Sequence, residues 1–226
     1  MHEILDNIVW NSLSGPHQTY AEGSGAARRY APGFSPILGF QDQDNPDFAS
    51  LATVCKPGES FYTDGWSGAA PDGWQIDHET TMFKMVYSGP IPAVDEAPEA
   101  IPLKSEHAEA ALELAILTNP GPFGPRTIEL GDYYGYFDGP QLISMTGERF
   151  FAGQYREVSG VCTHPNYQGR GLARKLMLKV IRQEMLRGEL PFLHVISSNL
   201  LARGLYERMG FENYLESVVR MISRIY

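Results

Sequence analysis

The sequence predicts an α/β fold whose sheet is mixed and mostly antiparallel, preceded by a less regular α+β region. Helical and strand-like hydrophobic patterns alternate through residues 98–226. The turn dipeptide Asp138-Gly139 joins two strand patterns as a hairpin, which makes those strands antiparallel. A helical pattern lies between the strand patterns at 157–163 and 192–196, and such a crossover makes these two strands parallel.

The composition is that of an ordinary globular protein, with room for one large domain or two small ones. The chain has 226 residues, of which 43% are hydrophobic and 20% charged. It has no apolar run long enough to cross a bilayer and no signal-peptide pattern at its start. Its two cysteines, Cys55 and Cys162, are too few for a disulfide framework or a zinc cluster. We therefore expect a cytoplasmic protein with reduced thiols, no metal site and no membrane partner.

Charge is distributed unevenly along the chain. The net charge of −9 combines a balance of −14 in residues 1–154 with a balance of +5 in residues 155–226. The basic second part suits an anionic cofactor, and the acidic first part hints at a cationic acceptor. Nucleic acid is not expected as a partner, because phosphate contacts dominate that kind of binding.

The first 97 residues carry weak signals, and we expect a domain boundary near residue 97. Short helices are expected at 4–13 and 46–54 and a strand at 80–87, separated by the turn signals Asp64-Gly65 and Asp72-Gly73. An acidic, proline-containing stretch at 95–99 reads as a linker. A degenerate partner domain is one interpretation of this region, although the sequence shows no internal repeat.

The elements after residue 97 follow the order strand, helix, three strands, helix, strand, helix, strand. Apolar stripes mark the helices, which stop at Asn119-Pro120, Gly188 and Gly210. Ser105 and Asn199 are the expected helix caps. The expected bounds are 101–104, 106–118, 133–137, 141–145, 157–163, 171–187, 192–196, 199–210 and 211–222.

The most informative segment is a glycine-rich turn between a strand and a helix. The N–H groups that begin a helix have no internal partner and lie at the positive end of its dipole. Glycines allow a ligand to approach that backbone closely, so the turn suits an anion such as phosphate. The dinucleotide pattern is only half met and the Walker pattern is absent. The segment reads Gln168-Gly169-Arg170-Gly171-Leu172-Ala173.

Two motifs together resemble the GNAT superfamily of N-acetyltransferases. The turn fits the family's signature Gln/Arg-x-x-Gly-x-Gly/Ala in full, and the second signature follows at the expected separation. The resemblance covers residues 98–226 and implies the GNAT fold, with its sheet splayed at the cofactor site. The residues of the second signature are Asn199, Ala202, Tyr206, Gly210 and Phe211.

The resemblance implies that acetyl-CoA, as acyl donor, lies between the two parallel strands. The backbone of Val161 and Thr163 would bind the pantetheine arm like an added strand. The N–H groups of the turn would hold the pyrophosphate. The implied cofactor-binding residues are Val161, Cys162, Thr163, Gln168, Gly169, Arg170, Gly171, Leu172, Ala173, Arg174 and Asn199.

Three residues are candidates for proton transfer. Tyr206 is the candidate acid for the leaving thiolate, because the family places a tyrosine there; a packed aromatic is the alternative. Glu157 is the candidate base, since family members carry a glutamate on this strand; an exposed strand carboxylate is the alternative. Glu148 is the rival base, unless it forms a salt bridge to Arg149 or Arg156.

Three further residues are interpreted as structural. His164 precedes a proline and reads as a turn residue. His194 lies on an apolar strand and reads as a satisfied core histidine. Cys162 reads as a small buried residue rather than a nucleophile.

The expected function is acetyl transfer from acetyl-CoA to a primary amine of a small molecule or peptide. The amine would attack the thioester directly in a ternary complex. The alternative is a non-catalytic CoA-binding sensor or regulatory module, and a nucleotide-binding protein is a weaker rival. No motif in the first 97 residues identifies the acceptor or an oligomeric state.

Overall fold

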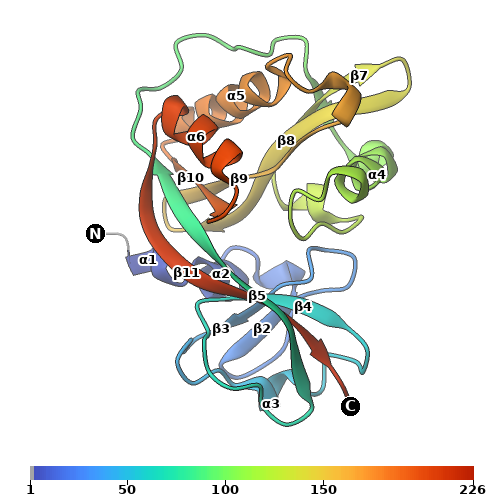
Figure 1. The fold of residues 1–226 in the computed structure, drawn as a ribbon, viewed down its shortest axis with the longest axis vertical. Helices are drawn as coiled ribbons and strands as arrows, with labels where there is room; N and C mark the ends of the chain where they lie inside the picture. The colour runs from blue at the N-terminus through green and yellow to red at the C-terminus, as the bar shows by residue number, and fades with distance from the viewer. Residues whose placement is uncertain (1–2) are drawn as a thin grey trace.

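The computed structural model describes residues 3–226, which form one eight-stranded and one three-stranded sheet. The larger sheet has the order β4-β11-β5-β10-β9-β8-β7-β6 (Figure 1). Its strands are β4 (Ser60–Asp64), β5 (Trp74–Tyr87), β6 (Ile101–Leu103), β7 (Tyr133–Asp138), β8 (Gln141–Ala152), β9 (Tyr155–Thr163), β10 (Leu190–Ile196) and β11 (Phe211–Arg224). The smaller sheet contains β1 (Ala21–Glu22), β2 (Ala27–Tyr30) and β3 (Leu38–Phe40).

The large sheet is antiparallel except between β9 and β10, which confirms the mixed, mostly antiparallel α/β fold. Helix α5 (Leu172–Leu186) crosses between these two strands and makes them parallel. Their pairing begins at Leu190 and Tyr155 and ends at Phe192 and Glu157. Beyond that pair the two strands separate, which is the expected splay.

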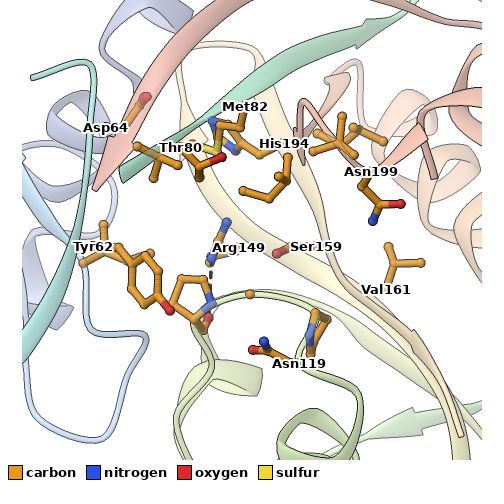
Figure 2. Close-up of a pocket in the computed structure, with 18 of the residues that line it drawn as sticks. Tyr62, Asp64, Thr80, Met82, Asn119, Arg149, Ser159, Val161, His194 and Asn199 are labelled. Carbon is orange, nitrogen blue, oxygen red and sulfur yellow. Dashed lines mark hydrogen bonds between the residues drawn. The ribbon is translucent and has the colours of Figure 1, made fainter. Parts of the chain in front are cut away.

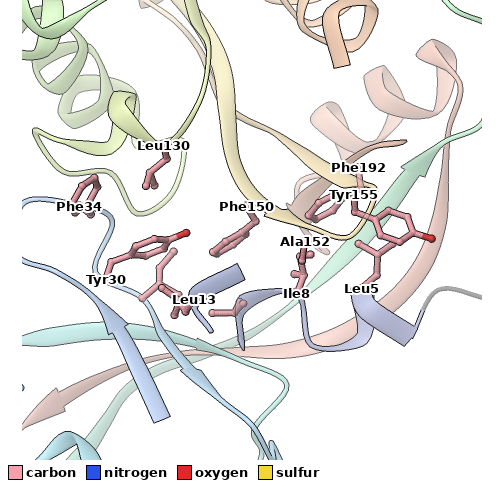
Figure 3. Close-up of a cluster of buried hydrophobic side chains, with 12 residues drawn as sticks. Leu5, Ile8, Leu13, Tyr30, Phe34, Leu130, Phe150, Ala152, Tyr155 and Phe192 are labelled. Carbon is pink, nitrogen blue, oxygen red and sulfur yellow. The ribbon is translucent and has the colours of Figure 1, made fainter. Parts of the chain in front are cut away.

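Helices cover both faces of the splayed region. Successive residues of β10 point to opposite faces, so Leu193 and Val195 face one side while Phe192 faces the other. Leu193 and Val195 pack with α5 and α6 (Leu200–Met209) in one hydrophobic core. Phe192 packs with α1 (Glu3–Asp6) and α2 (Ile8–Leu13) in another core (Figure 3). Helix α4 (Ala108–Thr118) packs against β8 and β9 nearer the other edge of the sheet.

The N-terminal region is built into the large sheet rather than beside it. Strands β5 and β11 pair along nearly their whole length and continue as a long band below the splayed region (Figure 1). There β11 also pairs with β4, and the band packs against the smaller sheet and α3 (Phe48–Leu51). The large sheet therefore uses strands from both sides of residue 97.

The first helical pattern is divided in the structure. The expected helix at 4–13 is two helices, α1 and α2, because the chain turns at Asn7. The side chain of Asn7 donates a hydrogen bond to the carbonyl of Phe40 (Nδ2–O 2.7 Å) instead of facing solvent on a continuous helix. The helix expected at 46–54 is limited to α3, whose N-cap, Asp47, accepts a hydrogen bond from the N–H of Ser50.

Other boundaries differ where tertiary partners extend or shorten an element. Strand β5 begins at Trp74 and β8 continues to Ala152, because both pair with long neighbouring strands. Strands β1 to β4 lie in the region with weak periodicity and were not expected. Ser105 begins a 3₁₀ turn, Ser105–His107, rather than capping α4. Asn199 caps α6 as expected, accepting from the N–H of Ala202.

Candidate active site

The glycine-rich turn is open to solvent and presents free backbone N–H groups. Gly169 and Gly171 both have φ +75°, in the left-handed region that favours glycine. A Cβ at either position would meet no atom within 4 Å, so a ligand has room to approach. The helical bond from Lys175 N–H to Gly171 C=O leaves the preceding N–H groups without helical acceptors. These features fit an anionic group such as a pyrophosphate.

Side chains of the same segment brace the turn. Gln168 donates to the carbonyl of Thr163 (3.3 Å), which ties the turn back to the end of β9. Arg170 lies 4.7 Å above the ring of Tyr167 and donates to the carbonyl of Asn166. His164 accepts from the Asn166 N–H, as its expected turn role requires. The turn is thus held open by interactions within its own segment.

A cavity of about 550 Å³ begins in the splay between β9 and β10 and extends to the N-terminal region (Figure 2). Val161, Asn199 and Tyr206 belong to its splay side. The opposite wall includes Tyr62, Asp64, Thr80 and Met82, from β4 and β5, together with the loop at 118–122. The cavity therefore joins residues that lie far apart in the sequence, and Arg149 and His194 lie between its two parts.

Tyr206 and Asn199, both from the second motif, line the splay side of the cavity. Tyr206 packs edge-on against Phe211, with ring centroids 6.1 Å apart. Burial raises the pKa of Tyr206 to about 12, so its phenol keeps its proton at neutral pH. Asn199 caps α6 and lines the cavity, so its two expected roles are geometrically compatible.

Glu157 is buried and fully engaged. Its side chain is 1% exposed and accepts two hydrogen bonds from Arg149, each 2.8 Å long. Its Oε1 also lies 2.6 Å from Nδ1 of His194. Burial would raise the pKa of Glu157, but the adjacent Arg149 and His194 outweigh it and hold the pKa well below its ordinary value. Among the described residues that line the cavity, Glu157 does not appear.

Glu148 faces a different group of charges. Its Oε1 lies 2.5 Å from Nη2 of Arg187, and its Oε2 lies 3.7 Å from Nε of Arg156. Burial raises the pKa of Glu148, although Arg187 and Arg156 oppose this effect. Glu148, like Glu157, is not among the described residues that line the cavity. The geometry therefore favours the salt-bridge alternative for Glu148 over a role beside the cavity.

His194 and Arg149 are the residues of this site that the sequence did not single out for function. His194 is a buried strand histidine, as expected, but only one of its ring nitrogens is satisfied. Nδ1 faces Glu157, whereas Nε2 is buried with no hydrogen-bond partner among the described residues. The feature of the sequence that could have indicated a functional role for His194 is its position. It lies two residues beyond Phe192, where the parallel strands separate.

Cys162 and the remaining candidates for other chemistry have structural surroundings. Cys162 is buried, and burial raises its pKa to about 11, which disfavours the thiolate. The described residues contain no cluster of three or more His, Cys, Asp or Glu side chains placed to hold a metal ion. No helix between residues 3 and 226 combines the length and the apolar character that a membrane span needs.

Comparisons with known proteins agree with this geometry. The family model described as FR47-like protein matches residues 133–220, which contain both motifs. No curated protein matches the sequence. A GCN5-related N-acetyltransferase from Kribbella flavida has 17% identity and a TM-score of 0.61 over 98% of this chain and 95% of that chain, which supports the fold.

A higher identity relates the chain to a solved structure along its whole length. The crystal structure of a GNAT-family protein from Novosphingobium aromaticivorans is 34% identical, with a TM-score of 0.88. The match covers 97% of this chain and 98% of that one, so it includes the N-terminal region as well as both motifs. The chain belongs to the GNAT family.

Proposed function

We propose that the protein is an acetyl-CoA-dependent N-acetyltransferase. It would move an acetyl group to a primary amine of a small molecule or peptide by direct attack in a ternary complex. One observation carries the proposal: three features lie next to one another. They are a solvent-open turn with N–H groups that can bind a phosphate, the splay between two parallel strands, and a cavity that leads from this splay. The names of the Novosphingobium and Kribbella relatives, both of the GNAT family, support the same chemistry.

The donor would lie across the turn and the splay. The N–H groups from Gly169 to Arg174 would hold its pyrophosphate, and the space beside Gly169 and Gly171 is open, since an added Cβ would meet no atom within 4 Å. The backbone of Val161 and Thr163 would bind the pantetheine arm, because β9 has no β10 partner beyond Glu157. Tyr206 would protonate the leaving thiolate, a role that suits a phenol kept neutral by burial.

The acceptor would enter the part of the cavity formed by β4 and β5. Its lining carboxylate, Asp64, is paired with the buried Lys84 at 2.8 Å, so Asp64 offers no free negative charge. Tyr62, Thr80 and Met82 give this wall an aromatic ring, a hydroxyl and a thioether. We therefore expect a preference for acceptors with one amine and an otherwise uncharged body.

Calorimetry and a transfer assay test the proposal together. CoA and acetyl-CoA should bind the folded protein more tightly than ATP or NAD does. A panel of primary amines, followed by release of free thiol from acetyl-CoA, should contain at least one acceptor. Absence of CoA binding by folded protein refutes the proposal, and tighter binding of ATP or NAD would indicate a nucleotide site. CoA binding without acetylation of any amine would instead indicate a sensor or regulatory module.

A further inference from the structure

We propose that His194 accepts the proton of the attacking amine and that Glu157 is a positioning residue for it. This inference rests on the proposed acetyl transfer and concerns which group carries the proton. It assigns a role to His194, which belongs to neither motif, and changes the role of Glu157 from base to partner.

The geometry fixes the imidazole between the protein interior and the cavity. Its Nδ1 lies 2.6 Å from Oε1 of Glu157, and its side chain is 6% exposed. The ring contacts Phe150 and Phe192 edge-on, with centroids 6.0 and 5.5 Å away, so packing restricts its rotation. His194 lines the cavity while Glu157 does not. Its Nε2 is buried and is the ring nitrogen without a hydrogen-bond partner among the described residues, so a bound amine would supply the partner that this atom lacks.

The hydrogen bond to Glu157 selects the tautomer that a base needs. Arg149 donates two hydrogen bonds to Glu157 and keeps that carboxyl ionised. An ionised carboxylate can only accept, so Nδ1 must carry the proton and Nε2 then presents its lone pair. A carboxylate beside Nδ1 also stabilises the imidazolium that forms when Nε2 takes up a proton.

The other charges around His194 occur mainly in pairs. On β5, Lys84 lies beside His194 in the strand register, and it forms an ion pair with Asp64 and donates to the carbonyl of Asp6. Beyond Glu157 lies His17, whose pKa falls to about 4 because of burial and nearby Arg156, so it stays neutral. On α2, Val9 lines the cavity with an apolar side chain. Glu157 is therefore the anion in direct contact with the imidazole ring.

His194 and Tyr206 together account for both protons that move during acetyl transfer. The amine nitrogen forms a bond to the thioester carbon as the carbon–sulfur bond breaks. The proton lost by the amine goes to Nε2 of His194, and the phenol of Tyr206 gives its proton to the departing sulfur. Solvent then takes the proton from His194 and returns one to Tyr206. The products are the amide and the free thiol, and both side chains regain their starting states.

Either glutamate would be a less favourable base. Glu157 is already held by Arg149 and His194, and protonating it would break an ion pair that is nearly inaccessible to solvent. Glu148 is 3% exposed and lies against Arg187 and Arg156 instead of the cavity. Nε2 of His194 has no hydrogen bond or ion pair to a described residue that proton uptake would break.

The pH dependence of kcat/KM in two variants separates these roles. We expect His194→Gln to lower kcat about 100-fold or more and to remove the acidic limb of the profile. Glu157→Gln should keep that limb and lower kcat less than His194→Gln does, because the amide oxygen can still accept the hydrogen bond from Nδ1 of His194. If Glu157 were the base, Glu157→Gln would remove the limb and His194→Gln would keep it, and this pattern overturns the inference.

Controls distinguish a wrong assignment of the base from a wrong proposal of acetyl transfer. His107→Asn changes a histidine of the turn before α4, outside the described cavity lining, and should behave as wild type. The dissociation constant for CoA should stay within about twofold in all variants. If CoA binds and acetyl transfer proceeds but His194→Gln keeps both rate and profile, the inference alone fails. Absence of CoA binding in the wild type would instead remove the proposed function.

A spectroscopic measurement on the wild-type protein keeps the inference testable if a variant does not fold. Nitrogen-15 spectra of labelled histidine distinguish the Nδ1–H tautomer from the Nε2–H tautomer. His194, assigned through its backbone among the six histidines, should carry its proton on Nδ1. A neutral His194 with the proton on Nε2 would overturn the inference without any measurement of activity.

Discussion

Replacing Gly171 with alanine tests whether the turn holds the pyrophosphate. Gly171 is the N-cap of α5 at φ +75°, and the site of its missing Cβ is open space. Alanine in the left-handed region costs about 1–2 kcal/mol, and its lower entropy in the unfolded chain returns about 0.4–1 kcal/mol. We therefore expect Gly171→Ala to lower the free energy of unfolding by about 1 kcal/mol, or roughly 2–4 °C in Tm.

The effect on CoA affinity should be larger than the effect on stability. A methyl group at residue 171 would occupy the space through which the pyrophosphate reaches the N–H groups of the turn. Loss of one hydrogen bond to a charged group costs about 1.5–3 kcal/mol, which corresponds to roughly 10–150-fold in Kd. Calorimetry with CoA measures this change directly. Pantetheine, which lacks the pyrophosphate, should bind the variant and the wild type equally well.

Gly188 provides a matched control. It has φ +78°, and a Cβ there also meets no atom within 4 Å, but it follows the other end of α5. Gly188→Ala should therefore lose the same stability and keep the wild-type affinity for CoA. Full CoA affinity in Gly171→Ala would show that the turn does not hold the pyrophosphate. CoA binding weakened as much by Gly188→Ala as by Gly171→Ala would show the same.

Two other substitutions test groups whose burial defines their protonation. Tyr206→Phe should lower kcat about 100-fold with CoA affinity nearly unchanged, because the variant lacks the proton for the thiolate; an unchanged rate would limit Tyr206 to packing. Glu184 is fully buried, no described residue bonds either carboxylate oxygen, and burial raises its pKa well above 4.5. The folded state therefore keeps this proton while the unfolded chain releases it above about pH 4.5, so wild-type stability falls as pH rises. Glu184→Gln has no such proton to lose, and its Tm advantage over wild type should grow between pH 5 and pH 8; an advantage that is constant or shrinks would contradict this account.

The sequence by itself determined the parts of the site whose geometry is local. The turn from Gln168 to Ala173 joins a strand to a helix, and its glycines take up the required backbone conformation without help from distant residues. Asn199 and Tyr206 lie on one short helix, so their spacing alone brings them to the same side of the cavity. The parallel pairing of β9 and β10 likewise followed from the helical crossover between them.

Only the tertiary structure decided which groups meet across the sheet. Glu157 looked like an available carboxylate because nothing near it in sequence showed that Arg149 and His194 would both turn toward it. Strands β1 to β4 could not be predicted from the sequence. Short segments such as β4 owe their extended form to pairing with a distant strand, here β11, more than 150 residues away. Side-chain protonation and cavity shape depend on such long-range contacts, whereas helix starts and glycine turns depend on a few neighbouring residues.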